Sequence, residues 1–171
     1  MSSAAGNIIH QKLDEFIRKY YKNQLIRGLI YSVGLVLLFY IGLSTLEYFA
    51  EFGTTVRTLL FYSFILTSAY VLTLYIAFPL AKLYSFGSII SYNQAAQIIG
   101  NHFSNVQDKL LNVLQLQNLE QSAVSVELLN AGINQKITEL KPVPFTAAID
   151  LRENRKYAKY ALIPILLLFG I

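Results

Sequence analysis

Cysteine and tryptophan are absent from this chain of 171 residues, and histidine occurs only twice. Without cysteine, the chain forms no disulfides, no thiolate metal site and no cysteine nucleophile. Because His10 and His102 lie far apart in the sequence, we expect no metal site made by this chain alone. HExxH pairs, glycine-rich phosphate loops and nucleophile motifs do not occur either. We therefore expect no catalytic, cofactor-binding or metal-binding residues, and a protein that is not an enzyme.

Charged residues are scarce as well, at 14% of the chain against 54% hydrophobic residues. Two long runs contain no charge at all: residues 28–46 read GLIYSVGLVLLFYIGLSTL, and residues 58–81 read TLLFYSFILTSAYVLTLYIAFPLA. A helix needs about 20 apolar residues to cross a bilayer, so both runs predict complete transmembrane helices. Ionisable groups inside a membrane mark ion or proton pathways, and their absence argues against transport chemistry in this pair of helices.

The positions of the basic residues predict a topology. Residues 1–27 contain five Lys or Arg, residues 82–159 contain eight, and the short loop at 47–57 contains one beside two glutamates. Since cytoplasmic segments are enriched in Lys and Arg, both basic segments are expected in the cytoplasm and the loop outside. This distribution accounts for the net charge of +4 without a nucleic-acid partner. A signal peptide is the less favoured interpretation, because its apolar region is usually only about 7–15 residues long.

A separate amphipathic helix is predicted before the first apolar run, within residues 1–27. Its apolar residues recur at helical spacing: Ile9, Leu13, Phe16, Ile17 and Tyr20. Its acidic residues precede basic ones by four positions, as Asp14 precedes Arg18 and Glu15 precedes Lys19, which favours ion pairs. Two interpretations stay open. The helix lies on the inner leaflet of the membrane, or it packs on the cytoplasmic segment or a neighbouring subunit.

Residues 82–159 indicate short amphipathic helices instead of a span. Capping-box patterns at Ser91–Gln94 and Ser104–Gln107 predict helices that begin just after each serine. A third helix is predicted through 124–140, with an apolar stripe of Val126, Leu129, Ile133, Ile137 and Leu140. The prolines of Lys141–Pro144 end it, since proline does not fit a helix interior. We expect a small helical bundle that leans on the membrane or on a partner.

Residues 160–171, YALIPILLLFGI, follow four basic residues: Arg152, Arg155, Lys156 and Lys159. Twelve helical residues rise only about 18 Å, which is short of a bilayer's thickness. We therefore expect the start of a third transmembrane helix, with a kink at Pro164, that continues in a longer natural chain.

Small residues in the two apolar runs are candidates for helix packing. Ala69, Thr73 and Ala77 recur every four positions in the second run, and Gly28 and Ser32 form a weaker pair in the first. Such ridges let helix backbones approach closely, so these five residues are expected to face other helices.

The stretch that most resembles a reactive site contains His102, Asp108, Lys109 and Asn112. A histidine and an aspartate together suggest a general base and the group that orients it. The favoured interpretation is structural: His102 ends one predicted helix and Asp108 begins the next, where the helix dipole stabilises each charge.

Two segments carry a resemblance. QAAQIIGNHFSNVQDKLLNVLQL (94–116) and PFTAAIDLRENRKYAKYALIP (144–164) resemble the N-terminal region of large Gram-negative envelope proteins catalogued as domain of unknown function 4175. The resemblance implies two close spans, a cytoplasmic helical segment, a third span and a long region beyond it, but no catalytic residues. With the Lys and Arg distribution, it implies a multi-pass protein of the bacterial inner membrane with a cytoplasmic N-terminus.

Together these observations predict an all-α membrane protein. We expect four parts: an amphipathic helix at 1–27, a transmembrane hairpin at 28–81, a cytoplasmic helical segment at 82–159 and the start of a third span at 160–171. The expected function is a non-enzymatic anchor and interaction module in contact with the lipid bilayer and other membrane subunits. The alternative is a subunit of a transporter or channel whose polar pathway lies outside this chain.

Overall fold

The structure is a computed structural model that describes residues 2–84, 90–119 and 126–170, and this part of the chain is helical without a β-strand. Its elements are α1 (Ser2–Ala50), α2 (Thr54–Leu72), the π-helix η1 (Thr73–Ala77), α3 (Phe78–Leu83), α4 (Tyr92–His102), α5 (Gln107–Leu119), α6 (Val126–Leu140), the 3-10 helices η2 (Phe145–Ala148) and η3 (Leu151–Glu153), and α7 (Asn154–Gly170). The all-α expectation is confirmed for the described residues.

The chain divides into two compact units. Met1–Tyr20 and Ser88–Asp150 form the first, which we call the bundle unit, and Tyr21–Gly87 and Leu151–Ile171 form the second, which we call the apolar unit. α1 contributes to both as one unbroken helix, because residues 2–50 contain no proline. The expected boundary at residue 27 is therefore not a break in the helix.

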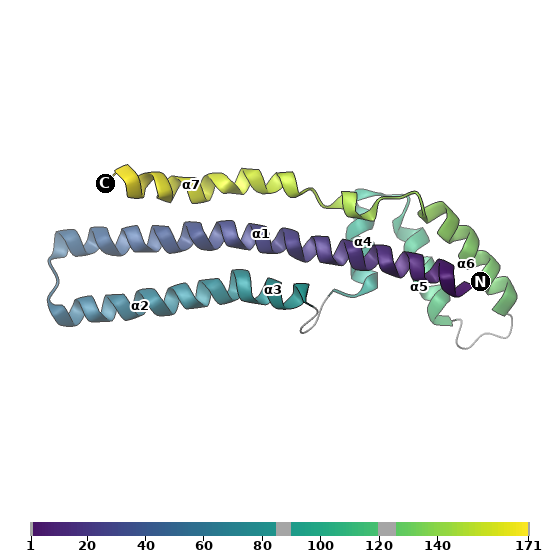
Figure 1. Ribbon diagram of the computed structural model, residues 1–171, viewed down its shortest axis with the longest axis horizontal. Helices are drawn as coiled ribbons and strands as arrows, with labels where there is room; N and C mark the ends of the chain where they lie inside the picture. Colours follow the sequence, from purple (N-terminus) through teal and green to yellow (C-terminus); the bar gives the residue numbers. More distant parts are fainter. Residues whose placement is uncertain (1, 85–89, 120–125, 171) are drawn as a thin grey trace. The chain divides into compact units, whose positions relative to one another are not determined.

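The apolar stripe at the start of α1 completes the core of the bundle unit. Ile9, Leu13 and Phe16 are completely buried, and Ile17 is nearly so. They share this core with side chains of α4, α5, α6 and η2, among them Ile99, Leu110, Ile133, Ile137, Leu140 and Phe145. Two interpretations were open for this helix. In the structure it packs on residues 88–150 of the same chain (Figure 1). The stripe is covered by other parts of the same chain.

Polar side chains of the same helix bind the connection between α6 and η2. Lys12 Nζ donates to the carbonyl oxygens of Lys141 and Val143, the latter at 3.0 Å, and Lys19 Nζ donates to that of Thr146 at 2.7 Å. The prolines of this connection supply no backbone N–H, so its carbonyls need donors from elsewhere. Burial of its ammonium group lowers the pKa of Lys12.

The two ion pairs expected within this helix are not among the salt bridges of the described residues, which include Arg57 with Glu47 and Lys109 with Glu139. Lys19 binds Thr146 instead, and Asp14 accepts a hydrogen bond from the Tyr92 hydroxyl at 3.0 Å. An exposed pair along a helix contributes only a few tenths of a kcal/mol, so tertiary partners outcompete it. Burial, and then the hydrogen bond to Asp14, raise the pKa of Tyr92.

Lys12→Met is expected to destabilise the bundle unit by about 1–3 kcal/mol, the range for hydrogen bonds to charged groups, because two carbonyls lose their donor. Hydrogen exchange of the amides in α4 and α6 measures this, since local opening of the unit exposes them. Arg18→Met, on the exposed side of α1, is the matched control and should change exchange little. Equal exchange in the two variants would contradict the role of Lys12.

Of the two predicted capping boxes, one is confirmed. Ser91 caps α4, accepting from the Gln94 backbone N–H, while the Gln94 side chain accepts from the Ser91 N–H. The second prediction, of a helix that begins just after Ser104, is wrong. α5 begins at Gln107, after a turn in which the Val106 N–H donates to the Phe103 carbonyl. Val106 is buried, and this burial fixes the turn in place of the serine cap.

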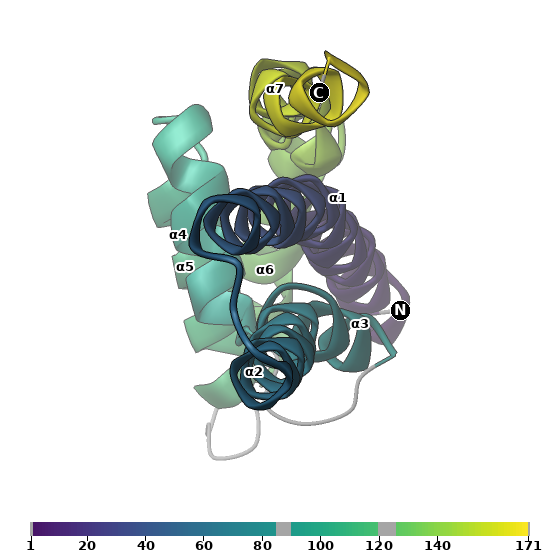
Figure 2. The same cartoon turned by 90° about the vertical axis from the view of Figure 1, so that its left-hand side faces the viewer.

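The apolar unit consists of the rest of α1 with α2, η1, α3 and α7. α1 lies between α2 and α7, as both views show (Figure 1 and Figure 2). Two described stretches are long and apolar enough to cross a membrane, Asn7–Ala50 and Thr54–Leu83. Their most apolar windows are only 11% and 6% buried, so most of their side chains face outward. α7, with 17 residues, is not one of these stretches.

Candidate functional site

The described residues do not assemble an acid–base or metal site from the residues singled out in the sequence. His102 ends α4 as predicted, is exposed, and lies edge-on against the neighbouring Phe103 ring at 4.8 Å. Asp108 lies in the first turn of α5, also as predicted, and no hydrogen bond joins it to His102. Within the described ranges, no three His, Asp or Glu side chains gather where they would hold a metal ion.

Lys109 has a structural partner. Its Nζ lies 2.6 Å from Glu139 Oε2 and joins α5 to α6 across the surface of the bundle unit. The hydrogen bond and the charge of Lys109 lower the pKa of Glu139. Asn112 is exposed. The four polar residues of this stretch therefore lie at separate places on the bundle unit and do not form one site.

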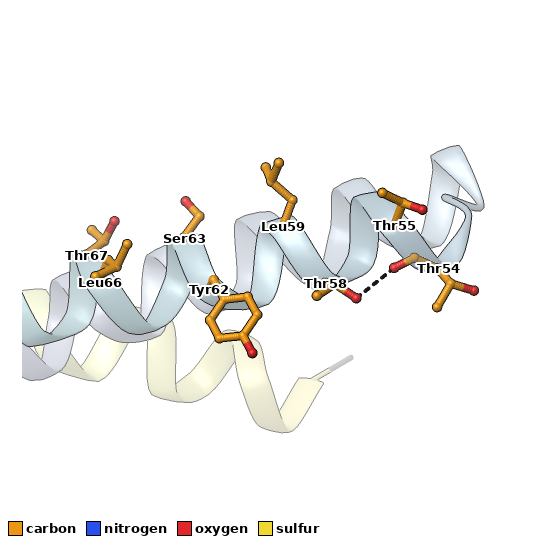
Figure 3. Close-up of a pocket in the computed structure, with 8 residues that line it drawn as sticks. All are labelled: Thr54, Thr55, Thr58, Leu59, Tyr62, Ser63, Leu66 and Thr67. Atoms are coloured by element: carbon orange, nitrogen blue, oxygen red, sulfur yellow. Dashed lines mark hydrogen bonds between the residues drawn. The ribbon is translucent and has the colours of Figure 1, made fainter.

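A shallow surface hollow of about 840 Å³ runs along one side of α2. Its lining comes from this one helix: Thr54, Thr55, Thr58, Leu59, Tyr62, Ser63, Leu66 and Thr67 (Figure 3). Thr58 Oγ1 donates to its own helix at the Thr54 carbonyl, 2.9 Å away, so this hydroxyl is already bonded. The lining of the hollow has no carboxylate, histidine or lysine, and Tyr62 is the residue in it with an acid–base group, without a second such group beside it in the lining.

α1 and η1 approach each other closely at Gly28, a residue that the sequence indicated only as half of a weak small-residue pair. Gly28 is buried, and a Cβ atom built on it would overlap the backbone carbonyl oxygen of Tyr75. Tyr75 precedes Pro79 by four residues, so in a regular α-helix the N–H of residue 79 would bond the Tyr75 carbonyl. Proline has no N–H to make this bond, and its ring pushes the carbonyl aside. This accounts for the π-helical turn at Thr73–Ala77, in which the Phe78 N–H bonds the Thr73 carbonyl.

α7 approaches the other side of α1 by the same means. A Cβ on Gly34 would lie 3.2 Å from the carbonyl oxygen of Tyr160, which precedes Pro164 by four residues. Both prolines are buried. YIAFP at 75–79 and YALIP at 160–164 thus share one pattern, in which a proline displaces a tyrosine carbonyl toward a glycine of α1. Gly28 and Gly34 lie about 120° apart around α1, which directs them to two different helices.

The ridge of Ala69, Thr73 and Ala77 does not make this contact. All three residues are exposed, and the Thr73 hydroxyl bonds its own helix at the Ala69 carbonyl. The side of the second run that meets α1 carries Tyr75 and Pro79, because the displaced carbonyl and the glycine fix which face turns inward. Gly28 and Ser32, the weaker pair, are the buried ones, and Ser32 Oγ bonds the Leu29 carbonyl at 3.0 Å.

A polar and aromatic cluster lies where α1 meets α7. The Arg27 guanidinium stacks on the Tyr157 ring at 4.6 Å, and Tyr31 lies edge-on to the same ring at 5.5 Å. One turn away, Asn154 Nδ2 donates to Asn23 Oδ1 at 2.5 Å. We call these five residues the Arg27 cluster. Tyr31 also reaches Tyr75, with ring centres 6.3 Å apart, so it touches both neighbours of α1.

Sequence reasoning missed the Arg27 cluster, although a signal was present. Asn23, Arg27 and Tyr31 follow one another at four-residue spacing and so share one face of α1. Asn154 and Tyr157 are likewise three apart on α7. The two faces belong to segments more than a hundred residues apart, and no local pattern pairs them.

No protein-family model, no curated protein and no solved structure matches this chain.

Proposed function

We propose that this chain is a non-enzymatic anchor and interaction module of the bacterial inner membrane, as part of a larger envelope protein or membrane complex. The observation that carries the proposal is the exposure of the two long apolar helices. A helix of this length inside a soluble protein is mostly buried, whereas the most apolar windows of these helices are 11% and 6% buried. Such surfaces need lipid or the helices of other subunits around them.

The proposed topology has the N-terminus and residues 82–159 in the cytoplasm and the loop at 47–57 outside. The asymmetry of Lys and Arg supports it. In this arrangement the bundle unit is the cytoplasmic part, and α7 begins a third crossing at Tyr160. α7 supports that role because its exposed residues from Leu162 onward are almost all apolar. The resemblance of residues 94–116 and 144–164 to domain of unknown function 4175 is consistent with this arrangement and is proposed with it.

The second candidate, a transporter or channel subunit, is favoured by the hydroxyl-bearing side of α2. Thr54, Thr55, Thr58, Ser63 and Thr67 line one surface hollow there. A pathway would require charged or carbonyl-lined partners from other subunits, because the described part of both apolar runs contains no ionisable carboxylate, histidine, lysine or arginine. We therefore rank the anchor first.

Single cysteines test the topology in this cysteine-free chain. Gln11→Cys, Thr54→Cys and Asn105→Cys replace exposed residues, one in each segment outside the apolar runs. On intact spheroplasts an impermeant maleimide should label only position 54, and permeabilisation should expose positions 11 and 105. Labelling of position 11 or 105 before permeabilisation would overturn the proposed orientation.

A further inference from the structure

We propose that the Arg27 cluster binds the phosphate of an anionic phospholipid in the leaflet where the apolar helices begin. The proposal rests on the proposed function, since it requires that the apolar unit lie in a bilayer. The lipid class is anionic phospholipid, and the binding residue is Arg27, where α1 contacts α7.

Arg27 has bonding capacity that the chain does not use. Its Nε is enclosed and has no acceptor among the described residues, and none of their carboxylates pairs with it. The residue as a whole is only half-buried, so part of it is accessible from outside. Stacking on Tyr157 at 4.6 Å fixes the plane of the guanidinium. A guanidinium held in one plane presents a pair of donors that matches two oxygens of a phosphate.

The contact between α1 and α7 also contains a hydrogen-bond acceptor without a donor among the described residues. Asn154 is 4% exposed, and its Oδ1 has no hydrogen-bond donor within reach. A buried polar atom without a partner is costly, and because this oxygen is enclosed, a headgroup bonds it only when a side chain of the cluster moves aside. A phospholipid supplies acceptors through its phosphate, and a donor through a hydroxyl when its headgroup is glycerol. Asn154 and Tyr157 lie on the same face of α7, next to Arg27.

The charge around the cluster favours an anion. The apolar unit has six basic residues besides Arg27 at the end of its apolar runs where Arg27 lies. They are Lys22, Lys82, Arg152, Arg155, Lys156 and Lys159. Glu153 is the one acidic residue among them, since Glu47 and Glu51 lie at the other end of α1. Basic residues near an anionic membrane surface attract anionic lipid. The cations gather anionic lipid, and Arg27 provides the defined contact.

A comparison of lipid binding tests the site. The full chain is reconstituted in nanodiscs of phosphatidylcholine, and retained phosphatidylglycerol is then counted by native mass spectrometry after titration. Arg27→Gln is expected to weaken retention of the first phosphatidylglycerol about fivefold or more, the factor that corresponds to 1 kcal/mol. Lys159→Gln, the matched control on the exposed side of α7, should change it less than twofold. An equal loss in both variants would show a diffuse charge effect and overturn the site.

Two further arms separate the alternatives. Inorganic phosphate at millimolar concentration should not displace the lipid, and displacement would mean that the site takes a free anion. If Arg27→Gln does not insert, Tyr157→Leu removes the ring that orients the guanidinium and should give the same loss, whereas unchanged retention would overturn the proposal. Insertion into pure phosphatidylcholine discs is scored first. A wild-type chain that does not insert contradicts the proposed function, and one that inserts without preferring phosphatidylglycerol contradicts this inference alone.

Discussion

Replacing Gly28 with leucine is expected to separate α1 from the second apolar helix, although the substitution removes no hydrogen bond and adds apolar surface. The first atom of the new side chain would occupy the place of the Tyr75 carbonyl oxygen. Backbone atoms do not rotate away as the end of a flexible side chain does. Overpacking of this kind typically costs about 1–3 kcal/mol, and here the cost falls on a close backbone contact between the two helices.

Cross-linking between Phe39→Cys and Phe64→Cys reports the contact, because the two rings stack 6.0 Å apart in the native packing. Gly28→Leu should lower the yield severalfold relative to the parent pair. Gly42→Leu is the matched control: it makes the same change in the same helix, at a glycine with nothing within 4 Å of its Cβ position. Gly34→Leu should disturb the α7 side instead. Equal yields for Gly28→Leu and Gly42→Leu would contradict the role of the glycine.

This pair of glycines marks a limit of sequence reasoning. Periodic spacing of small residues pointed to Ala69, Thr73 and Ala77, which the structure leaves exposed. The contact is made instead by a single glycine opposite a carbonyl that a proline displaces on another helix. A spacing rule inspects one helix at a time, whereas this contact depends on residues of two helices. The repeated YxxxP pattern, at 75–79 and 160–164, was the available signal.

Local signals were more dependable where no tertiary partner competed. The capping box at Ser91, the end of α6 before the prolines, and the helix ends at His102 and Asp108 all depend on a few neighbouring residues, and all are confirmed. At Ser104 the same pattern failed because burial of Val106 fixed a turn there. The exposed ion pairs of α1 failed for a related reason, since the connection from Lys141 to Thr146 gave Lys12 and Lys19 part-buried carbonyls to bond.

Phe16→Ala, in the apolar stripe at the start of α1, is expected to unfold most of the bundle unit and to leave the apolar unit folded. Phe16 is completely buried in a core that α4, α5 and α6 share. Removing a buried phenylalanine side chain costs about 3–5 kcal/mol, a large part of the roughly 5–15 kcal/mol that stabilises a typical domain. Because the two units have separate cores, the loss should not spread to the hairpin of α1 and α2.

Hydrogen exchange in the full chain in nanodiscs resolves the two units, since amides of α4 and α5 report on the bundle unit and those of α2 on the apolar unit. Phe16→Ala should speed exchange in α4 and α5 by two orders of magnitude or more, as about 3 kcal/mol requires. Phe49→Ala, at a side chain 80% exposed, is the control and should leave both regions unchanged. If Phe16→Ala instead left exchange in α4 and α5 unchanged and weakened binding to lipid, the stripe would serve the membrane, and the interfacial interpretation of this helix would replace the packed one.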